Sequence, residues 1–154
     1  MALSALRWFK LALMFQALLL AYWLAIEVLD LFPWNDIAAR PEDYDLHRSI
    51  AWHGLQQLAF IVLMATGIQL LAFMAVCGYA VWLAFQLWNW WMPWVNGASA
   101  EWRDEYRALF SRTLNVLPVD SLHPTPDLQN LVLQILTLAT LCATAMAVAR
   151  MQHL

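Results

Sequence analysis

The amino-acid sequence predicts an all-α integral membrane protein with four transmembrane helices, the middle two forming a helical hairpin, and one amphipathic interfacial helix in the second outer loop. The first observation behind this prediction is composition, because 63% of the 154 residues are hydrophobic and only 12% are charged. Water-soluble domains carry about 45–50% apolar and about 25% charged residues. The mean hydropathy is +0.57. Such a chain has too little polar surface for a compact particle in water, and we expect it in a lipid bilayer.

The second observation is that long apolar blocks divide the chain. A crossing helix needs about 20 mostly apolar residues, because every backbone amide in hydrocarbon must be bonded internally. The block 11–32 meets this requirement and ends at Pro33. The block 128–149 also meets it and is closed by Arg150. These two blocks predict the first and the last span.

The apolar block between them is too long for a single crossing. Residues 50–95 include no charged side chain, and as one helix of 46 residues they would measure about 69 Å. This length is more than twice the roughly 30 Å hydrocarbon core, so the block must fold back. The expected spans are 50–73 and 78–95, with Gly78 ending a helix at the turn. The Thr66–Gly67 pair is a competing position for that turn.

Tryptophan placement supports the fold-back. Trp prefers the headgroup level at either edge of a bilayer. Tryptophans gather at both ends of the 50–95 block, at Trp52, Trp88, Trp90, Trp91 and Trp94. Both ends of the block are therefore expected at one interface, with the turn near their midpoint.

The distribution of cations predicts the orientation. With four spans, both termini share one side, and the other side carries the outer loops 33–49 and 96–127. The side of the termini holds cations and no acidic residue, namely Arg7, Lys10 and Arg150. The positive-inside rule makes this side cytoplasmic, although the outer loops carry five cations of their own. We expect a bacterial inner membrane as the location.

The second outer loop has helical periodicity over 99–117. Its apolar side chains recur at spacings of three or four, with charged residues between them, at Trp102, Tyr106, Leu109, Phe110, Thr113 and Leu117. We expect an amphipathic helix with Ser99 as N-cap and Glu101 in the first turn, where the helix dipole favours an anion. Beside the interfacial tryptophans, this helix is expected to lie in the membrane plane and to end at Pro118.

Two acidic residues near the outer end of the first span are candidate functional groups. Glu27 and Asp30 are three residues apart on one helix face, and ionisable groups inside a bilayer are costly. Arg48, just before the second span, is their expected cationic partner. One interpretation is an interfacial ion pair. The other is a proton or cation relay in which Glu27 is the deeper group.

Three of the four histidines are candidate metal ligands. His47 and His53 lie around the entry to the second span and His123 lies in the second outer loop, so the three could share one face. Together with Asp45 and Asp120 they could form a metal site. The spacing favours ordinary interfacial histidines, since residues six apart on a helix point about 120° away from each other.

A bound haem, pigment or quinone has candidate contacts at His53, Gln86 and Asn89. Haem held by two histidines of this chain is disfavoured, because only His53 lies within a predicted span. Gln86 and Asn89 are predicted to share a helix face and could line a polar pocket. The alternative is hydrogen bonding between helices, the common use of uncharged polar residues in membranes. The residues concerned are Gln56, Gln57, Gln69, Gln86, Asn89, Asn130 and Gln134.

The sequence favours association over catalysis. It contains no recognisable Ser/His/Asp or Cys/His arrangement, and its two cysteines stand alone in apolar runs. Small residues in the last span form a strip suited to close packing, within this chain or with a neighbour. The strip consists of Ala139, Thr140, Ala143, Thr144 and Ala147.

We therefore expect a non-enzymatic accessory or stabilising subunit of a larger membrane complex, or a homo-oligomer. The alternative function is a small transporter, a channel or a lipophile-binding protein that uses Glu27, Gln86 and Asn89. The expected partners are the lipid bilayer and other membrane subunits or a second copy of the chain. A net charge of -3 makes nucleic acid an unsuitable partner.

Overall fold

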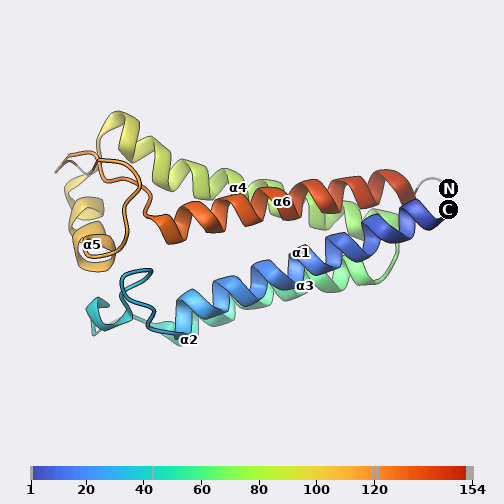
Figure 1. The fold of residues 1–154 in the computed structure, drawn as a ribbon, viewed down its shortest axis with the longest axis horizontal. Coiled ribbons are helices and arrows are strands. Elements are labelled where there is room, and N and C mark those ends of the chain that lie inside the picture. The colour runs from blue at the N-terminus through green and yellow to red at the C-terminus, as the bar shows by residue number, and fades with distance from the viewer. Residues whose placement is uncertain (1, 43, 119, 121, 152–154) are drawn as a thin grey trace.

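The computed structural model describes residues 2–42, 44–118, 120 and 122–151. Every regular element within these ranges is helical. Four helices run side by side: α1 (Ala2–Val28), α3 (Leu55–Ala65), α4 (Gln69–Asn96) and α6 (Leu128–Met151) (Figure 1). Both termini lie at one end of this bundle, which we call the termini end, and the two long loops lie at the other, the loop end.

Among the described residues, three helices are long and apolar enough to cross a membrane. They are Leu3–Val28, Gln69–Asn96 and Leu128–Met151. The helical, membrane-like class predicted from composition is thus confirmed, whereas the predicted end of the first span at residue 32 is wrong. The helix ends at Val28 because the following loop caps its last carbonyl groups, as described below.

The second predicted span differs most from its prediction. The short helix α2 (Leu46–Ser49), the π-helix η2 (Ile50–Gly54) and α3 follow one another without a break, so this helical segment begins inside the predicted loop and ends at Ala65. The turn uses Thr66–Gly67, which was the competing position, and the expected turn near 73–78 is wrong. Gly67 has φ 68°, a conformation that side-chain-bearing residues rarely adopt. The Thr66 hydroxyl donates to the Leu63 carbonyl at 2.7 Å.

Gly78 lies inside α4 and serves close packing rather than a turn. A Cβ built at this position would overlap the ring of Phe60 on α3. That ring also makes an edge contact with Tyr79, with 4.9 Å between ring centroids. Tyr79 is fully buried in a cluster with Leu19 and Trp23 of α1. The absent side chain at Gly78 therefore lets α3 and α4 approach at the centre of the bundle.

The contact between α1 and α6 is built on small and polar residues. Ala12 packs in one cluster with Ala143 and Ala147. The Gln16 amide donates to the Thr144 hydroxyl at 3.0 Å, and both residues are fully buried. Thr140 donates to the Phe15 carbonyl at 3.3 Å. The predicted small-residue strip therefore packs within this chain.

The second loop contains α5 (Ala100–Phe110) at the loop end (Figure 1). Ser99 is its N-cap as predicted, since its hydroxyl accepts from the Trp102 amide at 3.2 Å. The apolar side of α5 packs against Trp90 of α4, with 5.0 Å between the ring centroids of Trp90 and Phe110. The helix stops at Phe110, seven residues before the predicted end, because the chain then turns to pair with the first loop.

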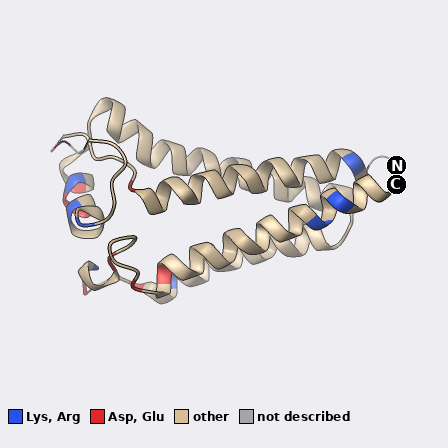
Figure 2. Cartoon of the chain, viewed as in Figure 1, with Lys and Arg blue, Asp and Glu red and all other residues tan. Residues whose placement is uncertain are grey.

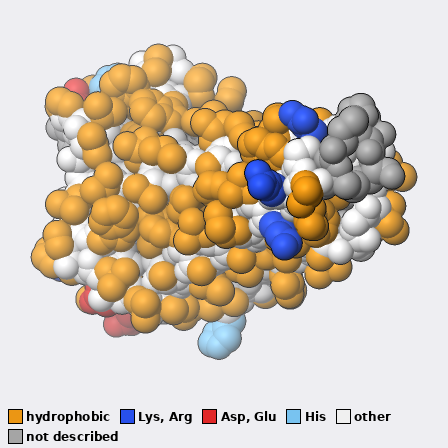
Figure 3. Space-filling model, turned by 45° about the vertical axis from the view of Figure 1, so that its right-hand side comes forward, with side chains coloured by type: hydrophobic (Ala, Val, Ile, Leu, Met, Phe, Trp, Pro, Cys, Tyr) orange, Lys and Arg blue, Asp and Glu red, His pale blue; other side chains and the backbone are white. Residues whose placement is uncertain are grey.

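Charged residues lie toward the two ends of the bundle, and the stretches between them are uncharged (Figure 2). The termini end carries Arg7, Lys10 and Arg150. On the face drawn in Figure 3, hydrophobic side chains cover most of the surface, and Lys and Arg gather near the termini. This pattern matches helices that present apolar flanks to hydrocarbon and charges to water.

Replacing Gly78 by Ala is expected to lower the free energy of unfolding by about 1 kcal/mol, because the overlap with Phe60 outweighs the better helix propensity of Ala. The cost should shrink when Phe60→Leu is present in the same chain. Unfolding of the detergent-solubilised protein, followed by circular dichroism, measures both effects. Ala84→Val, at an exposed position of the same helix, is the control. An equal loss of unfolding free energy in Gly78→Ala and in Ala84→Val would contradict the packing role of Gly78.

Candidate functional site

The carboxyl end of α1 is closed by two side chains from the first loop. The last turn of a helix leaves carbonyl groups without helical partners. The Asn35 amide donates to the carbonyls of Ile26 and Leu29 at 2.7 and 2.8 Å, and its own oxygen accepts from the Leu31 amide. The guanidinium of Arg40 donates to the Glu27 carbonyl at 2.8 Å. A cation here also stabilises the negative end of the helix dipole.

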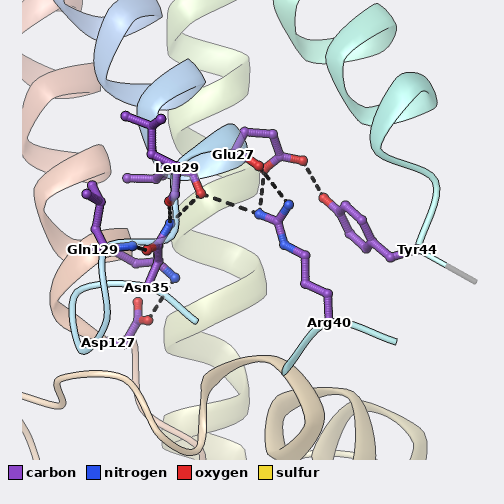
Figure 4. Close-up of polar contacts among 9 residues, drawn as sticks. Glu27, Leu29, Asn35, Arg40, Tyr44, Asp127 and Gln129 are labelled. Atoms are coloured by element: carbon purple, nitrogen blue, oxygen red, sulfur yellow. Dashed lines mark hydrogen bonds and ion pairs between the residues drawn. The ribbon is translucent and has the colours of Figure 1, made fainter. Parts of the chain in front are cut away.

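The carboxylate of Glu27 lies within the same arrangement (Figure 4). Glu27 is 7% exposed. Its Oε2 pairs with Nη2 of Arg40 at 3.2 Å, and its Oε1 accepts from the Tyr44 hydroxyl at 2.5 Å. The Arg40 guanidinium also lies over the Tyr44 ring, 4.6 Å from its centroid. Both carboxylate oxygens are thus engaged by groups from the first loop.

The prediction that Arg48 is the cationic partner of Glu27 is wrong. Arg40 takes this place, and Arg48 is an exposed residue of α2 whose backbone amide is bonded to the N-cap Asp45. Asp30 is exposed and lies beyond the end of α1, so it does not share a helix face with Glu27. The helix ends early because Asn35 and Arg40 bind its last carbonyls. Of the three predicted relay residues, the structure therefore places only Glu27 in a buried site.

The Glu27 cluster borders a cavity of about 140 Å³ at the loop end. Four segments meet around it: α1, the first loop, α5 and α6. Its polar wall includes Glu27, Asn35, Asp36, Arg40 and Asn130, and Leu109, Phe110 and Leu133 form part of its apolar wall. Burial, followed by the hydrogen bond to Glu27, raises the pKa of Tyr44, so its phenol remains protonated at neutral pH. The cavity is large enough to hold several water molecules.

Two further buried carboxylates join the loops to each other. Asp36 of the first loop pairs with Nε of Arg112 in the second loop at 2.7 Å. The Leu114 amide donates to the Pro33 carbonyl at 3.0 Å, which adds a backbone link between the same loops. Asp127, just before α6, is fully buried. These contacts make the loop end one connected block.

Asp127 is satisfied by neutral donors. Its Oδ2 accepts from the Thr113 hydroxyl at 2.7 Å and from the Gln129 amide at 3.0 Å. Its Oδ1 accepts from the backbone and side-chain amides of Asn130 at 3.0 and 2.8 Å, which makes Asp127 the N-cap of α6. Burial raises the pKa of Asp127, and the four hydrogen bonds oppose that rise without cancelling it.

An open groove of about 970 Å³ lies beside the cavity and shares Tyr44 and Leu109 with it. One wall comes from the segment 41–55, which includes α2 and η2, and the other comes from α5 through Glu105 and Leu109. The groove contains the charged side chains Asp45, Arg48 and Glu105 as well as His53. No pattern in the sequence pointed to this groove, because its walls are far apart along the chain.

The predicted cofactor contacts are not brought together. Gln86 is buried and donates to the Thr137 hydroxyl of α6 at 3.2 Å, whereas Asn89 is exposed and faces a separate surface hollow. The two residues are three positions apart on α4 but have different surroundings, so they do not line a common pocket. His53 packs against Trp23, with ring centroids 5.9 Å apart. Gln86 and Gln134 instead support the alternative of hydrogen bonding between helices, since Gln134 accepts from Trp91 of α4 at 2.9 Å.

The three candidate metal ligands occupy different surroundings. His47 is exposed on α2, His53 lies in η2, and His123 is bonded through Nδ1 to the Trp94 carbonyl at 2.9 Å. Within the described ranges, no group of three His, Cys, Asp or Glu side chains could hold a metal ion. The remaining histidine, His153, lies outside the described residues.

Sequence reasoning missed Asn35, Arg40 and Tyr44. Arg40 carried a usable signal, because it is a cation that closely follows an apolar helix with an acid in its last turn. Asn35 and Tyr44 carried no such signal, since their roles depend on how the loop folds back over the end of α1. The geometry of this site fits ion pairing and loop anchoring.

No family model matches the chain, and comparison with curated proteins and with solved structures finds no similar protein.

Replacing Arg40 by Gln is expected to lower the free energy of unfolding by about 3 kcal/mol, because it leaves a buried carboxylate without its cation. Glu27→Gln in the same chain should recover part of that loss. Chemical unfolding in detergent, monitored by circular dichroism, provides the measurement.

The control for this experiment is Arg107→Gln, which removes the exposed ion pair with Asp104. Its expected effect is within about 0.5 kcal/mol, because water screens exposed pairs. A loss for Arg40→Gln no larger than that of the control would show that the buried pair does not stabilise the loop end.

The raised pKa of Asp127 predicts that the stability of the protein depends on pH. Its pKa is raised in the folded protein, so the folded state binds this proton more tightly than the unfolded state. Its contribution is therefore present below the ordinary aspartate pKa and is lost as pH rises through the folded value. Melting temperatures of the wild type and Asp127→Asn between mildly acidic and neutral pH test this sign. The difference, wild type minus variant, should fall as pH rises, and a rise would contradict the assignment.

Proposed function

We propose that the chain is a four-span membrane protein that acts by association, as an accessory or stabilising subunit of a larger membrane complex or as a homo-oligomer. The proposed setting is a bacterial inner membrane with both termini in the cytoplasm. The observation that carries the proposal is the use of the buried carboxylates at the loop end. Glu27, Asp36 and Asp127 are all engaged in holding helix ends and loops in place. This supports a preformed outer surface rather than a reaction centre.

The helical segment 46–65 is the proposed fourth span. It packs against α1 and α4, so it completes the bundle between two candidate spans. At about 1.5 Å per residue its length approaches the roughly 30 Å hydrocarbon core. Large apolar side chains face away from the bundle along it, with Leu58 47% and Val62 56% exposed. Exposed apolar side chains at this depth suit contact with lipid or with another membrane helix.

The apolar flanks support association. Most residues of the three candidate spans are not buried within the chain, because only 33%, 28% and 44% of their most apolar windows are covered. Polar side chains such as Gln16 and Gln86 point inward and bond to α6. The outward surface is thereby left free of polar groups along much of its length. Such a surface can pack against another helix without burying an unpaired polar atom.

Purification from the native membrane in mild detergent tests the proposal. The expected result is a complex of defined stoichiometry, measured by light scattering and native mass spectrometry. Disulfide or chemical cross-links should then place the contact on the flanks of the bundle. A monomer under every mild extraction condition would overturn the proposal.

The proposed topology predicts the accessibility of three engineered cysteines. Asp45→Cys and Val116→Cys lie in the two loops and Leu3→Cys lies near the N-terminus, each at an exposed position. The background is Cys77→Ala with Cys142→Ala, because both native cysteines are exposed. An impermeant maleimide added to intact spheroplasts should label the two loop positions strongly. Leu3→Cys should react only after permeabilisation, and labelling of the loop positions from opposite sides would exclude four spans.

A second candidate function is the binding of a lipophilic or amphiphilic ligand. The groove beside η2 favours it, because it combines charged groups with apolar walls and a volume of about 970 Å³. Ligand pockets typically occupy about 300–1,000 Å³. The residues first expected to serve a ligand or a relay, Glu27, Gln86 and Asn89, lie in three separate surroundings and do not support a common pocket.

A further inference from the structure

The groove between the first loop and α5 has charges of both signs on its walls. Arg48 supplies a guanidinium, and Asp45 and Glu105 supply carboxylates. All three residues are exposed, so their charged groups are accessible from the groove. A simple anion would meet two carboxylates, and a simple cation would meet the guanidinium. A ligand that carries both charges satisfies the lining best.

The same groove has apolar walls that continue onto the flank of the bundle. Trp52 is 72% exposed and Leu55 is 63% exposed, and Leu109 of α5 lies opposite this segment. Beyond Leu55, the exposed residues Leu58 and Val62 extend the apolar surface along α3. A tail that starts in the groove can therefore run along α3 toward the centre of the membrane without leaving apolar surface.

His53 is a further polar residue of the groove wall. Its Nδ1 atom is buried and has no hydrogen-bond partner among the residues that the structure describes, although the residue lines the groove. A buried polar atom without a partner is costly unless water or a ligand satisfies it. The π-helical turn that carries His53 is a form of helix that frequently occurs at functional sites.

These features identify the class of ligand. Lipid tails need a continuous apolar path, a phosphate matches a guanidinium through charge-assisted hydrogen bonds, and a primary ammonium can donate to carboxylates. A zwitterionic phospholipid with an ethanolamine headgroup has all three parts. An anionic glycerol headgroup lacks the ammonium and would face Asp45 and Glu105 without compensation.

We propose that the groove is a specific site for one phospholipid of the phosphatidylethanolamine class. The phosphate pairs with Arg48, the ammonium group faces Asp45 and Glu105, and one acyl chain follows Trp52 and Leu55 onto α3. This proposal goes beyond association, because the site lies within one copy of the chain and requires no partner protein.

Native mass spectrometry of the detergent-solubilised protein tests the site. The probes are phosphatidylethanolamine, phosphatidylcholine and phosphatidylglycerol with identical acyl chains, each titrated into delipidated protein. The expected result is one tightly bound phosphatidylethanolamine, with about tenfold weaker binding of the other two lipids. Equal affinity for the three lipids, or a preference for phosphatidylglycerol, would overturn the proposal.

Two substitutions separate the headgroup contacts. Arg48→Gln removes the phosphate contact and should weaken phosphatidylethanolamine and phosphatidylglycerol alike. Glu105→Gln removes one ammonium contact and should lower the preference for phosphatidylethanolamine over phosphatidylglycerol. Arg107→Gln and Glu101→Gln are the matched controls, because both residues belong to α5 and neither lines the groove. Unchanged phosphatidylethanolamine affinity in Arg48→Gln, or an unchanged preference over phosphatidylglycerol in Glu105→Gln, would contradict the proposed contacts.

The folded state and the association state are measured in the same experiment. Arg48 and Glu105 are exposed, so their replacement is expected to leave helix content and melting temperature near the wild-type values. The mass spectrum reports lipid binding for the monomer and for any oligomer separately. A wild-type protein that is always monomeric but prefers phosphatidylethanolamine would count against the proposed function alone. A wild-type complex that shows no preference among the three lipids would count against this site alone.

Discussion

The carboxylate of Glu27, buried at the end of an apolar helix, is the constraint on which the loop end depends. A charge in such a place requires a cation and hydrogen-bond donors close by. The first loop supplies both through Arg40 and Tyr44, and its path is therefore fixed over the end of α1. The same guanidinium binds the last carbonyls of the helix. Together with the Asn35 amide, this ion pair determines where α1 ends and how the following loop runs.

The second loop is organised around the first. Arg112 reaches Asp36, and the Leu114 amide reaches the Pro33 carbonyl, so the chain after α5 is drawn toward the first loop. Asp127 then ties this segment to the start of α6 through Thr113 and Asn130. The cavity beside Glu27 and the groove beside η2 are the spaces left between these loops and α5. Their shape follows from the packing of loops that the buried carboxylates hold in place.

The sequence predicted the helical class and the interior of the long helices, because both depend on apolar composition. It misplaced helix ends, which depend on single contacts. The turn was expected at the midpoint of the apolar block, but the two legs are unequal, because the helical segment from Leu46 ends at Ala65 whereas α4 runs for 28 residues from Gln69. In the site, Glu27 was identified because a buried acid is costly. Asn35 and Tyr44 were not, since loop residues gain their roles only when the loop folds.

The contacts of the buried Glu27 carboxylate bear on what the loop end can do. A proton relay requires a group that can exchange its proton and its partner as a cycle proceeds. Glu27 is held on one oxygen by Arg40 and on the other by Tyr44, whose raised pKa keeps the phenol as a donor. Arg40 also binds the backbone carbonyl of Glu27, so a change of partner would disturb the end of α1 as well. The arrangement therefore favours a fixed ion pair with a structural role at the end of α1.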